Sequence, residues 1–370
     1  MKTNKKRNHA ILLEVIGCVL ACSLQASAFS LVNSRYSNKI PSAKSGSFIQ
    51  TSLGAIKKDV ATSTENSAGL YKHFADHVWS KLLQETDWFE EDTTVPSELM
   101  SNTAPAKGMP EGSVVKITTR ALVPSSPDNA KKVRYARYAL LETLLPSPLA
   151  DGGEPSNSTE GIQVLNMVIF PAADTNLPVF GADVVSLPGN RHLLLLDAQP
   201  MDNTCKKNKR QYQHHFVDWY KRHVVGDNNY HEQQMNGSDQ TWRSPKNDSI
   251  MTSFPWGGDM PEEVAPYVSD YALWTRLVPG AENDDDDDAT HDPITKIQGD
   301  FWHAFKDHLD QYLDLLNTYT SDQDTESLKE QIAYVDYRLN NDPAKPMLKS
   351  LYGEEWTERV LQEVLFPNVR

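Results

Sequence analysis

The sequence predicts an α/β sandwich in which helices pack on one antiparallel sheet. Apolar residues first recur at helical spacing over residues 70–86. Short apolar or alternating runs then occupy residues 113–200, and helical spacing returns from about residue 300 to the end. Because the strands follow one another with helices before and after them, we expect a single sheet region covered by helices.

Each element of the first part follows from local spacing. The apolar face of the first helix consists of Leu70, Phe74, Val78, Leu82 and Leu83. Residues 87–112 are acidic and then rich in Pro, Gly and Ser, so we predict a loop there. Strands are predicted at 114–122, 162–170, 179–187 and 192–196, and residues 149–160 are predicted to form an exposed loop.

The second part alternates between polar segments and helices. Residues 201–250 are polar and insert-like, with a helical piece around Phe216, Trp219 and Tyr220. A strand is predicted at 271–278. The segment 281–292 contains five consecutive aspartates and is typical of a solvated loop; a calcium site there is the alternative, although the Gly and distal Glu of an EF-hand are absent. The helical C-terminal region repeats apolar residues at Phe301, Phe305, Leu309, Tyr312 and Leu316, and again at Ile332, Val335, Leu339, Trp356, Val360, Val364 and Leu365.

The N-terminus has the composition of a targeting segment. A basic start precedes a mostly apolar stretch and a small-residue cleavage motif at 26–28, which predicts a signal peptide over 1–28. Residues 29–66 are rich in Ser, Thr, Lys and Asn and read as a transit-peptide-like segment, which leaves 67–370 as the folded domain. This bipartite leader predicts delivery to a plastid. Simple secretion is the alternative, and the sequons at Asn157, Asn236 and Asn247 would permit it.

Charge and cysteine content exclude several classes of function. The net charge of −14 argues against a nucleic-acid or anionic-membrane partner for the whole molecule. After removal of the leader only Cys205 remains, so neither a disulfide framework nor a cysteine-ligated iron–sulfur site is expected. Two local basic clusters are candidate contacts for an acidic partner, or simply solvated surface: Lys131, Lys132, Arg134 and Arg137, and Lys206, Lys207, Lys209 and Arg210.

Familiar nucleotide and metal motifs are missing. The sequence has no G-x-G-x-x-G after a strand, no P-loop, no H-E-x-x-H and no C-x-x-C. A histidine-rich stretch could suggest a metal site, but it lies in the polar insert and we expect none there; its members are His214, His215, His223 and His231.

Two acids remain as candidate catalytic residues. Asp183 follows an apolar run and a Pro-x-x-Gly turn, and Asp342 lies between a Tyr-rich helix and a Pro-bounded turn. Burial disfavours the charged form of a carboxyl group and raises its pKa, so a buried acid can act as a proton donor near neutral pH. The structural alternatives are a turn residue at a strand start for Asp183, and an Asx turn or helix N-cap for Asp342.

Four long segments resemble the signature regions of the ferredoxin-dependent bilin reductases. They are VLNMVIFP…NLPVFGADVVSLPGNRHLLLLDAQP (164–200), FPWGGDMPEEVAPYVSDYALWTRL (254–277), HLDQYLDLL (308–316) and YVDYRLNNDPAKPML…YGEEWTERVLQEVLF (334–366). The resemblance implies a single-domain α/β/α sandwich with a central antiparallel sheet and a pocket for a linear tetrapyrrole. It also implies that no flavin or metal is bound, and that reduced ferredoxin supplies single electrons while side chains supply protons.

The resemblance assigns roles to four residues. Asp183 matches the central aspartate beside the pyrrole nitrogens, and Asp342 matches the second acid on the helical side of the pocket. Asn166 stands where the phycocyanobilin-forming branch has histidine, and Arg338 matches a pocket-lining arginine, so both are expected to bind substrate.

The same segments are most similar to the branch that reduces 15,16-dihydrobiliverdin to phycoerythrobilin at the A-ring. Biliverdin reduction to phytochromobilin or to 15,16-dihydrobiliverdin is the alternative within the family. The 201–250 insert, the aspartate run and Lys345, where arginine is usual, depart from these branches. Besides ferredoxin and a bilin, the expected partners are an upstream bilin reductase or a downstream lyase. Two other functions stay open: a non-catalytic bilin carrier, and a secreted protein that binds calcium through the aspartate run.

Overall fold

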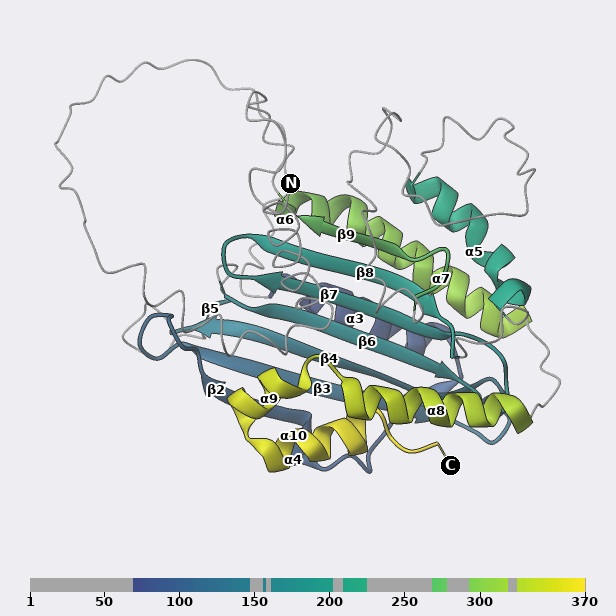
Figure 1. Cartoon of the computed structure of the whole chain (residues 1–370), viewed down its shortest axis with the longest axis horizontal. Coiled ribbons are helices and arrows are strands. Elements are labelled where there is room, and N and C mark those ends of the chain that lie inside the picture. The colour runs from purple at the N-terminus through teal and green to yellow at the C-terminus, as the bar shows by residue number, and fades with distance from the viewer. Residues whose placement is uncertain are drawn as a thin grey trace, which may run out of the picture.

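A computed structural model describes residues 69–146, 156–157, 161–201, 209–224, 268–277, 293–318 and 325–369. Within these residues, nine strands form one sheet in the order β1-β3-β4-β6-β7-β8-β9, with β2 paired to β3 and β5 paired to β4 (Figure 1). Every pairing is antiparallel. The strands are β1 (Phe89–Glu91), β2 (Ser101–Pro105), β3 (Val114–Pro124), β4 (Val133–Leu145), β5 (Ser156–Asn157), β6 (Gln163–Pro171), β7 (Val179–Leu187), β8 (Arg191–Gln199) and β9 (Leu273–Leu277).

Helices cover both faces of this sheet, with α3 on one side and α8, α9 and α10 on the other (Figure 1). The helices are α3 (Lys72–Ser80), α4 (Ser97–Met100), α5 (Lys209–Val224), α6 (Pro293–Lys296), α7 (Trp302–Thr318), α8 (Thr325–Asn341), α9 (Lys345–Tyr352) and α10 (Glu354–Val360), and π-helical turns span Lys81–Glu85, Ile297–Phe301 and Leu361–Leu365. The predicted α/β/α sandwich with a central antiparallel sheet is therefore confirmed.

One face of the sheet carries the larger core. Successive residues of a strand point to opposite faces, so Phe180, Ala182 and Val184 of β7 enter the same cluster. Side chains of α3, α5 and α7 complete that cluster, among them Phe74 of α3 and Trp219 of α5. Because β7 and β8 are buried on both faces, their sequences read as nearly continuous apolar runs.

The opposite face carries two smaller clusters with polar side chains between them. The first is covered by α8, α9, α10 and the C-terminal π-helical turn, and the second packs against residues 268–272. On β7, Val179 belongs to the first cluster and Val185 to the second, so Asp183 lies between the two along the strand. Asp183 is therefore a polar side chain between two apolar clusters on this face of the sheet.

Most predicted elements occur where the spacing placed them. The helix at 70–86 is α3 with its π-helical continuation, the strand at 179–187 has the bounds of β7, and the strand at 271–278 contains β9. The helix around Phe216 and Trp219 is α5, and the C-terminal region is helical. Two predictions were wrong or incomplete: residues 87–112 contain β1, α4 and β2 rather than a loop, and the thirteen-residue β4 was not predicted.

Several expectations fall on residues that the structure does not describe. These are the leader at 1–66, the aspartate run, Lys206, Lys207, His231 and the sequons at Asn236 and Asn247. Of the predicted loop at 149–160, only β5 is described, and there the backbone pairs with β4. No helix within the described ranges is long and apolar enough to cross a membrane.

Candidate active site

Asp183 and Asn166 stand directly opposite each other on neighbouring strands. The register pairs Asn166 of β6 with Asp183 of β7, so their side chains leave the sheet on the same face. The Asn166 amide nitrogen donates a hydrogen bond to Oδ1 of Asp183. Both side chains are only partly buried. The structure therefore brings these two predicted site residues together.

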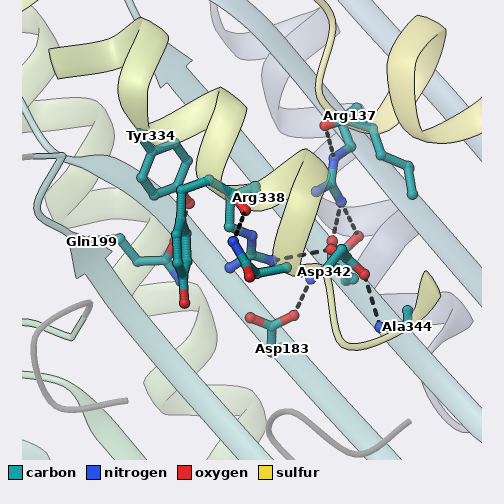
Figure 2. A network of polar contacts seen from close by, with 11 residues as sticks. Arg137, Asp183, Gln199, Tyr334, Arg338, Asp342 and Ala344 are labelled. Carbon is teal, nitrogen blue, oxygen red and sulfur yellow. Dashed lines mark hydrogen bonds and ion pairs between the residues drawn. The ribbon is translucent and has the colours of Figure 1, made fainter. Parts of the chain in front are cut away.

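Asp342 approaches the same region from the helical layer. It follows the last residue of α8, and its Oδ1 accepts a hydrogen bond of 2.8 Å from the backbone N–H of Ala344. This contact is the Asx turn that the sequence offered as a structural role for Asp342. The other carboxylate oxygen lies 3.6 Å from Nη2 of Arg338, one helical turn earlier. Figure 2 shows this carboxylate beside Asp183, Arg338 and Arg137.

The environment of Asp342 favours its protonated form. Burial raises the pKa of this carboxyl group, and the Arg338 guanidinium and the Ala344 amide oppose that effect without cancelling it. The negative charge of Asp183 adds to the rise. A carboxyl group whose pKa is raised can hold a proton closer to neutral pH, which is what a general acid needs.

Among the described residues, Arg338 is one of two cations near both acids. Burial by itself would lower its pKa, but Tyr334, Asp342 and Asp183 outweigh that effect and hold the pKa above its ordinary value. Its guanidinium carbon also lies 5.1 Å from the centre of the Phe366 ring. Arg338 and Asp342, four residues apart in the sequence, thus form an ion pair at the end of α8.

Three further residues belong to the site that the sequence did not indicate. The hydroxyl of Tyr334 donates a 2.5 Å hydrogen bond to Oε1 of Gln199. Gln199 can lie across β7 because position 181 is glycine, where a Cβ would stand 2.6 Å from the Gln199 amide nitrogen. Tyr334 precedes Arg338 by one helical turn, and this spacing could have predicted that the two side chains lie on the same face of the helix.

The third is Arg137, which was expected at a basic surface patch for an acidic partner. Its side chain is 1% exposed, so that expectation was wrong for this residue. Instead Arg137 donates to the backbone carbonyl of Leu365 at 3.0 Å, and to both the backbone oxygen and the side-chain oxygen of Asn166. Arg137 thus lies beside the acids inside the protein (Figure 2).

In the histidine-rich stretch, the histidines whose contacts are described pair with carboxylates. His223 lies 3.0 Å from the carboxylate of Asp307, and His215 lies 3.4 Å from that of Asp314, so both face α7. Among the described residues there is no group of three or more His, Cys, Asp and Glu side chains suited to a metal ion.

Comparison with known proteins identifies the family. The model of the ferredoxin-dependent bilin reductases matches residues 156–367, more than half of the chain. The chain belongs to the ferredoxin-dependent bilin reductase family. This bilin reductase is thus an oxidoreductase that acts on a bilin with ferredoxin as electron donor.

Similar curated proteins include two phycoerythrobilin:ferredoxin oxidoreductases. The one from Nostoc punctiforme is 31% identical over 242 residues, covering 64% of this chain and 77% of the relative. The one from Synechococcus sp. strain CC9902 is 35% identical over 206 residues, covering 55% of this chain and 65% of the relative. Among solved structures, tomato phytochromobilin synthase in complex with biliverdin shares the fold of this bilin reductase, with a TM-score of 0.52 at 18% identity over 81% of this chain and 83% of that one.

Proposed function

We propose that this bilin reductase converts 15,16-dihydrobiliverdin to phycoerythrobilin by reducing its A-ring. Two electrons would arrive singly from reduced ferredoxin, and each transfer would be coupled to uptake of one proton by the bilin. The names of the relatives from Nostoc and Synechococcus support this choice of reaction. No flavin or metal is required in this scheme, because ferredoxin carries the electrons and side chains carry the protons.

The observation that carries this proposal is the pair of acids with different environments on one sheet face. Asp183 is hydrogen-bonded by an amide and partly exposed, whereas Asp342 is buried with a raised pKa. Acids held in different environments suit two distinct proton transfers. We assign to Asp183 the protonation and positioning of the bilin, and to Asp342 proton donation to the A-ring. Asn166 and Arg338 would contact the bound substrate.

A second reaction is favoured by one comparison. The tomato structure is a phytochromobilin synthase solved with biliverdin, so biliverdin is the alternative substrate for this chain. An anaerobic turnover assay with a ferredoxin-reducing system separates the two. We expect 15,16-dihydrobiliverdin to be converted to phycoerythrobilin and biliverdin to be left unchanged. Conversion of biliverdin alone would contradict the proposed substrate, and tight binding of both bilins without turnover would favour a carrier.

Partners and location are part of the same proposal. Lys131 and Lys132, just before the start of β4, remain candidate ferredoxin contacts, since ferredoxins are acidic and attracted by local positive charge. Arg134 is not one of them, because its guanidinium donates to the side chain of Gln331 and to the carbonyl of Pro367. An upstream bilin reductase or a downstream lyase would exchange pigment with the protein.

The leader predicts that the enzyme works in a plastid. Fusing residues 1–66 to a fluorescent protein and locating the fusion in an alga with such plastids tests this location. Secretion of the fusion would contradict it.

A further inference from the structure

Arg137 is a buried cation that the proposed proton transfers do not use. It lies on β4, two strands from Asp183, and its side chain is 1% exposed, so it cannot reach a ferredoxin. It also contacts neither acid through a hydrogen bond described for it; its partners are Leu365 and Asn166. Burying a guanidinium costs desolvation free energy unless hydrogen bonds compensate for it. The role of Arg137 therefore follows from the groups to which it donates.

The donors and acceptors fix the orientation of the Asn166 amide. An arginine has five N–H donors and no acceptor, so the atom of Asn166 that faces Arg137 must be the carbonyl oxygen Oδ1. The amide nitrogen then points the other way, toward Oδ1 of Asp183, and donates to it. Oδ1 of Asp183 is therefore an acceptor, and a proton carried by this carboxyl group belongs on Oδ2.

We propose that Arg137 is a positioning residue that locks the amide of Asn166 and thereby selects Oδ2 of Asp183 as the oxygen that delivers the proton. This inference rests on the proposed role of Asp183 in bilin reduction. Without Arg137, the Asn166 amide could turn over and present its oxygen to Asp183. That arrangement would either repel the carboxylate or place the proton on Oδ1, away from the substrate.

Arg137 is itself held rigidly enough for this task. Its Nε donates to the Leu365 carbonyl at 3.0 Å, and its Nη1 donates to the Asn166 backbone oxygen at 3.1 Å. The guanidinium carbon lies 5.1 Å from the centre of the Phe366 ring. Burial, and then the charge of Arg338, lower the Arg137 pKa to about 10, which still leaves the group charged at neutral pH. The planar fork of donors gives the contact a direction that a lysine could not.

The test pairs Arg137→Met with a matched control on the same strand. Arg134 also holds the C-terminal segment, through a 3.2 Å hydrogen bond to the carbonyl of Pro367, but it has no contact with Asn166 among those described for it. Arg134 also donates to Gln331 of α8, so Arg134→Met reports the cost of loosening α8 and the C-terminal segment while leaving the contacts of Asn166 in place. Both substitutions are made in the wild-type chain and in Asn166→Ala, and thermal melting confirms that each variant folds.

We expect Arg137→Met to slow bilin reduction by about 10- to 100-fold while the bilin Kd changes by less than about 3-fold, because misplacing a catalytic group affects the rate more than binding. In the Asn166→Ala chain the same substitution should lower the rate of bilin reduction by less than about 3-fold, because alanine has no side-chain amide for Arg137 to orient. Equal losses in both chains, or an equal loss in Arg134→Met, would overturn the proposal.

A second readout does not depend on turnover. In ¹⁵N-labelled protein, the side-chain NH₂ signals of Asn166, identified by their disappearance in Asn166→Ala, should shift in Arg137→Met and stay in place in Arg134→Met. Unchanged signals in Arg137→Met would overturn the lock even if the enzyme acted on another bilin. Absence of bilin turnover in the wild-type protein would instead count against the proposed function. If Arg137→Met does not fold, Arg137→Lys keeps the charge without the fork, and the same shift is expected.

Discussion

Asn166 of β6 donates its side-chain amide to Asp183 of β7, directly across the strand pair. A neutral amide in this position can donate to the carboxylate but cannot take up or release a proton near neutral pH. In the proposed reaction, proton delivery from this point of the sheet would therefore depend on Asp183, with Asp342 as a second acid that approaches from the helical layer (Figure 2).

Replacing Asp342 should separate binding from turnover. In Asp342→Asn the side chain keeps an oxygen that can accept from the Ala344 amide, so the local turn should survive. The proton donor is lost, and we expect the rate of bilin reduction to fall by about 10²- to 10⁴-fold. Bilin titration followed by absorption should give a Kd close to the wild-type value. Turnover within about 2-fold of wild type would remove Asp342 from the mechanism.

The same substitution should change how stability depends on pH. Because the pKa of Asp342 is raised in the folded protein, the folded state binds more protons than the unfolded chain, and stability declines as pH rises from the ordinary aspartate range through the raised value. Asparagine does not titrate, so Asp342→Asn should be at least as stable as wild type at neutral pH, with the advantage shrinking toward about pH 4. Urea unfolding at several pH values measures this. A variant that loses stability only at neutral pH would show that the charged form of Asp342 is the favoured one.

Gly181 should be intolerant of even a methyl group. A Cβ there would lie 2.6 Å from Nε2 and 2.8 Å from Cδ of Gln199, so Gln199 must move and leave the buried Tyr334 hydroxyl without its acceptor. We expect Gly181→Ala to lower the free energy of unfolding by about 1–3 kcal/mol. Gln199→Ala removes the clash, so the double variant should be more stable than the sum of the single effects implies. Strict additivity in chemical denaturation would contradict this reading.

His308 should make the fold sensitive to mild acid. Its ring is fully buried and stacks between Phe180 at 4.8 Å and Trp219 at 4.5 Å, and burial followed by the nearby His223 lowers its pKa to about 3. The unfolded chain therefore binds a proton that the folded chain does not, and stability falls as pH drops below the ordinary histidine range. The slope is about 1.4 kcal/mol per pH unit for one proton.

His308→Phe keeps an aromatic ring in the stack and cannot titrate. We expect it to flatten the loss of stability between pH 7 and pH 5 relative to wild type, as followed by thermal or urea unfolding. His223→Phe is the control, since that side chain is partly exposed and pairs with Asp307. Equal slopes in wild type and His308→Phe would show that His308 is protonated in the folded state.

The central strands and the spacing on α8 could be predicted because each depends on local sequence alone. Val179–Leu187 is a nearly continuous apolar run between turn residues, and Asp342 follows Arg338 by one helical turn at the end of α8. The strand β4 was missed because its two arginines resembled part of a surface basic cluster. Its mostly apolar run from Tyr135 to Leu145 was the available signal.

Arg137 could not be placed from the sequence because its partners are distant in the chain. Asn166 is 29 residues away and Leu365 is 228 residues away, so only the strand register and the return of the C-terminal segment bring them together. The same holds for Tyr334 and Gln199, which are 135 residues apart. Side-chain partners of this kind are set by tertiary packing and not by local pattern.

The most direct test of the account is a single-turnover reduction of bound 15,16-dihydrobiliverdin by Asp183→Asn, with reduced ferredoxin and without oxygen. Absorption and electron paramagnetic resonance would follow the pigment. We predict normal bilin binding, entry of the first electron, and a long-lived bilin radical with no phycoerythrobilin, because the electron arrives but the proton does not. Formation of phycoerythrobilin at the wild-type rate would contradict the role of Asp183.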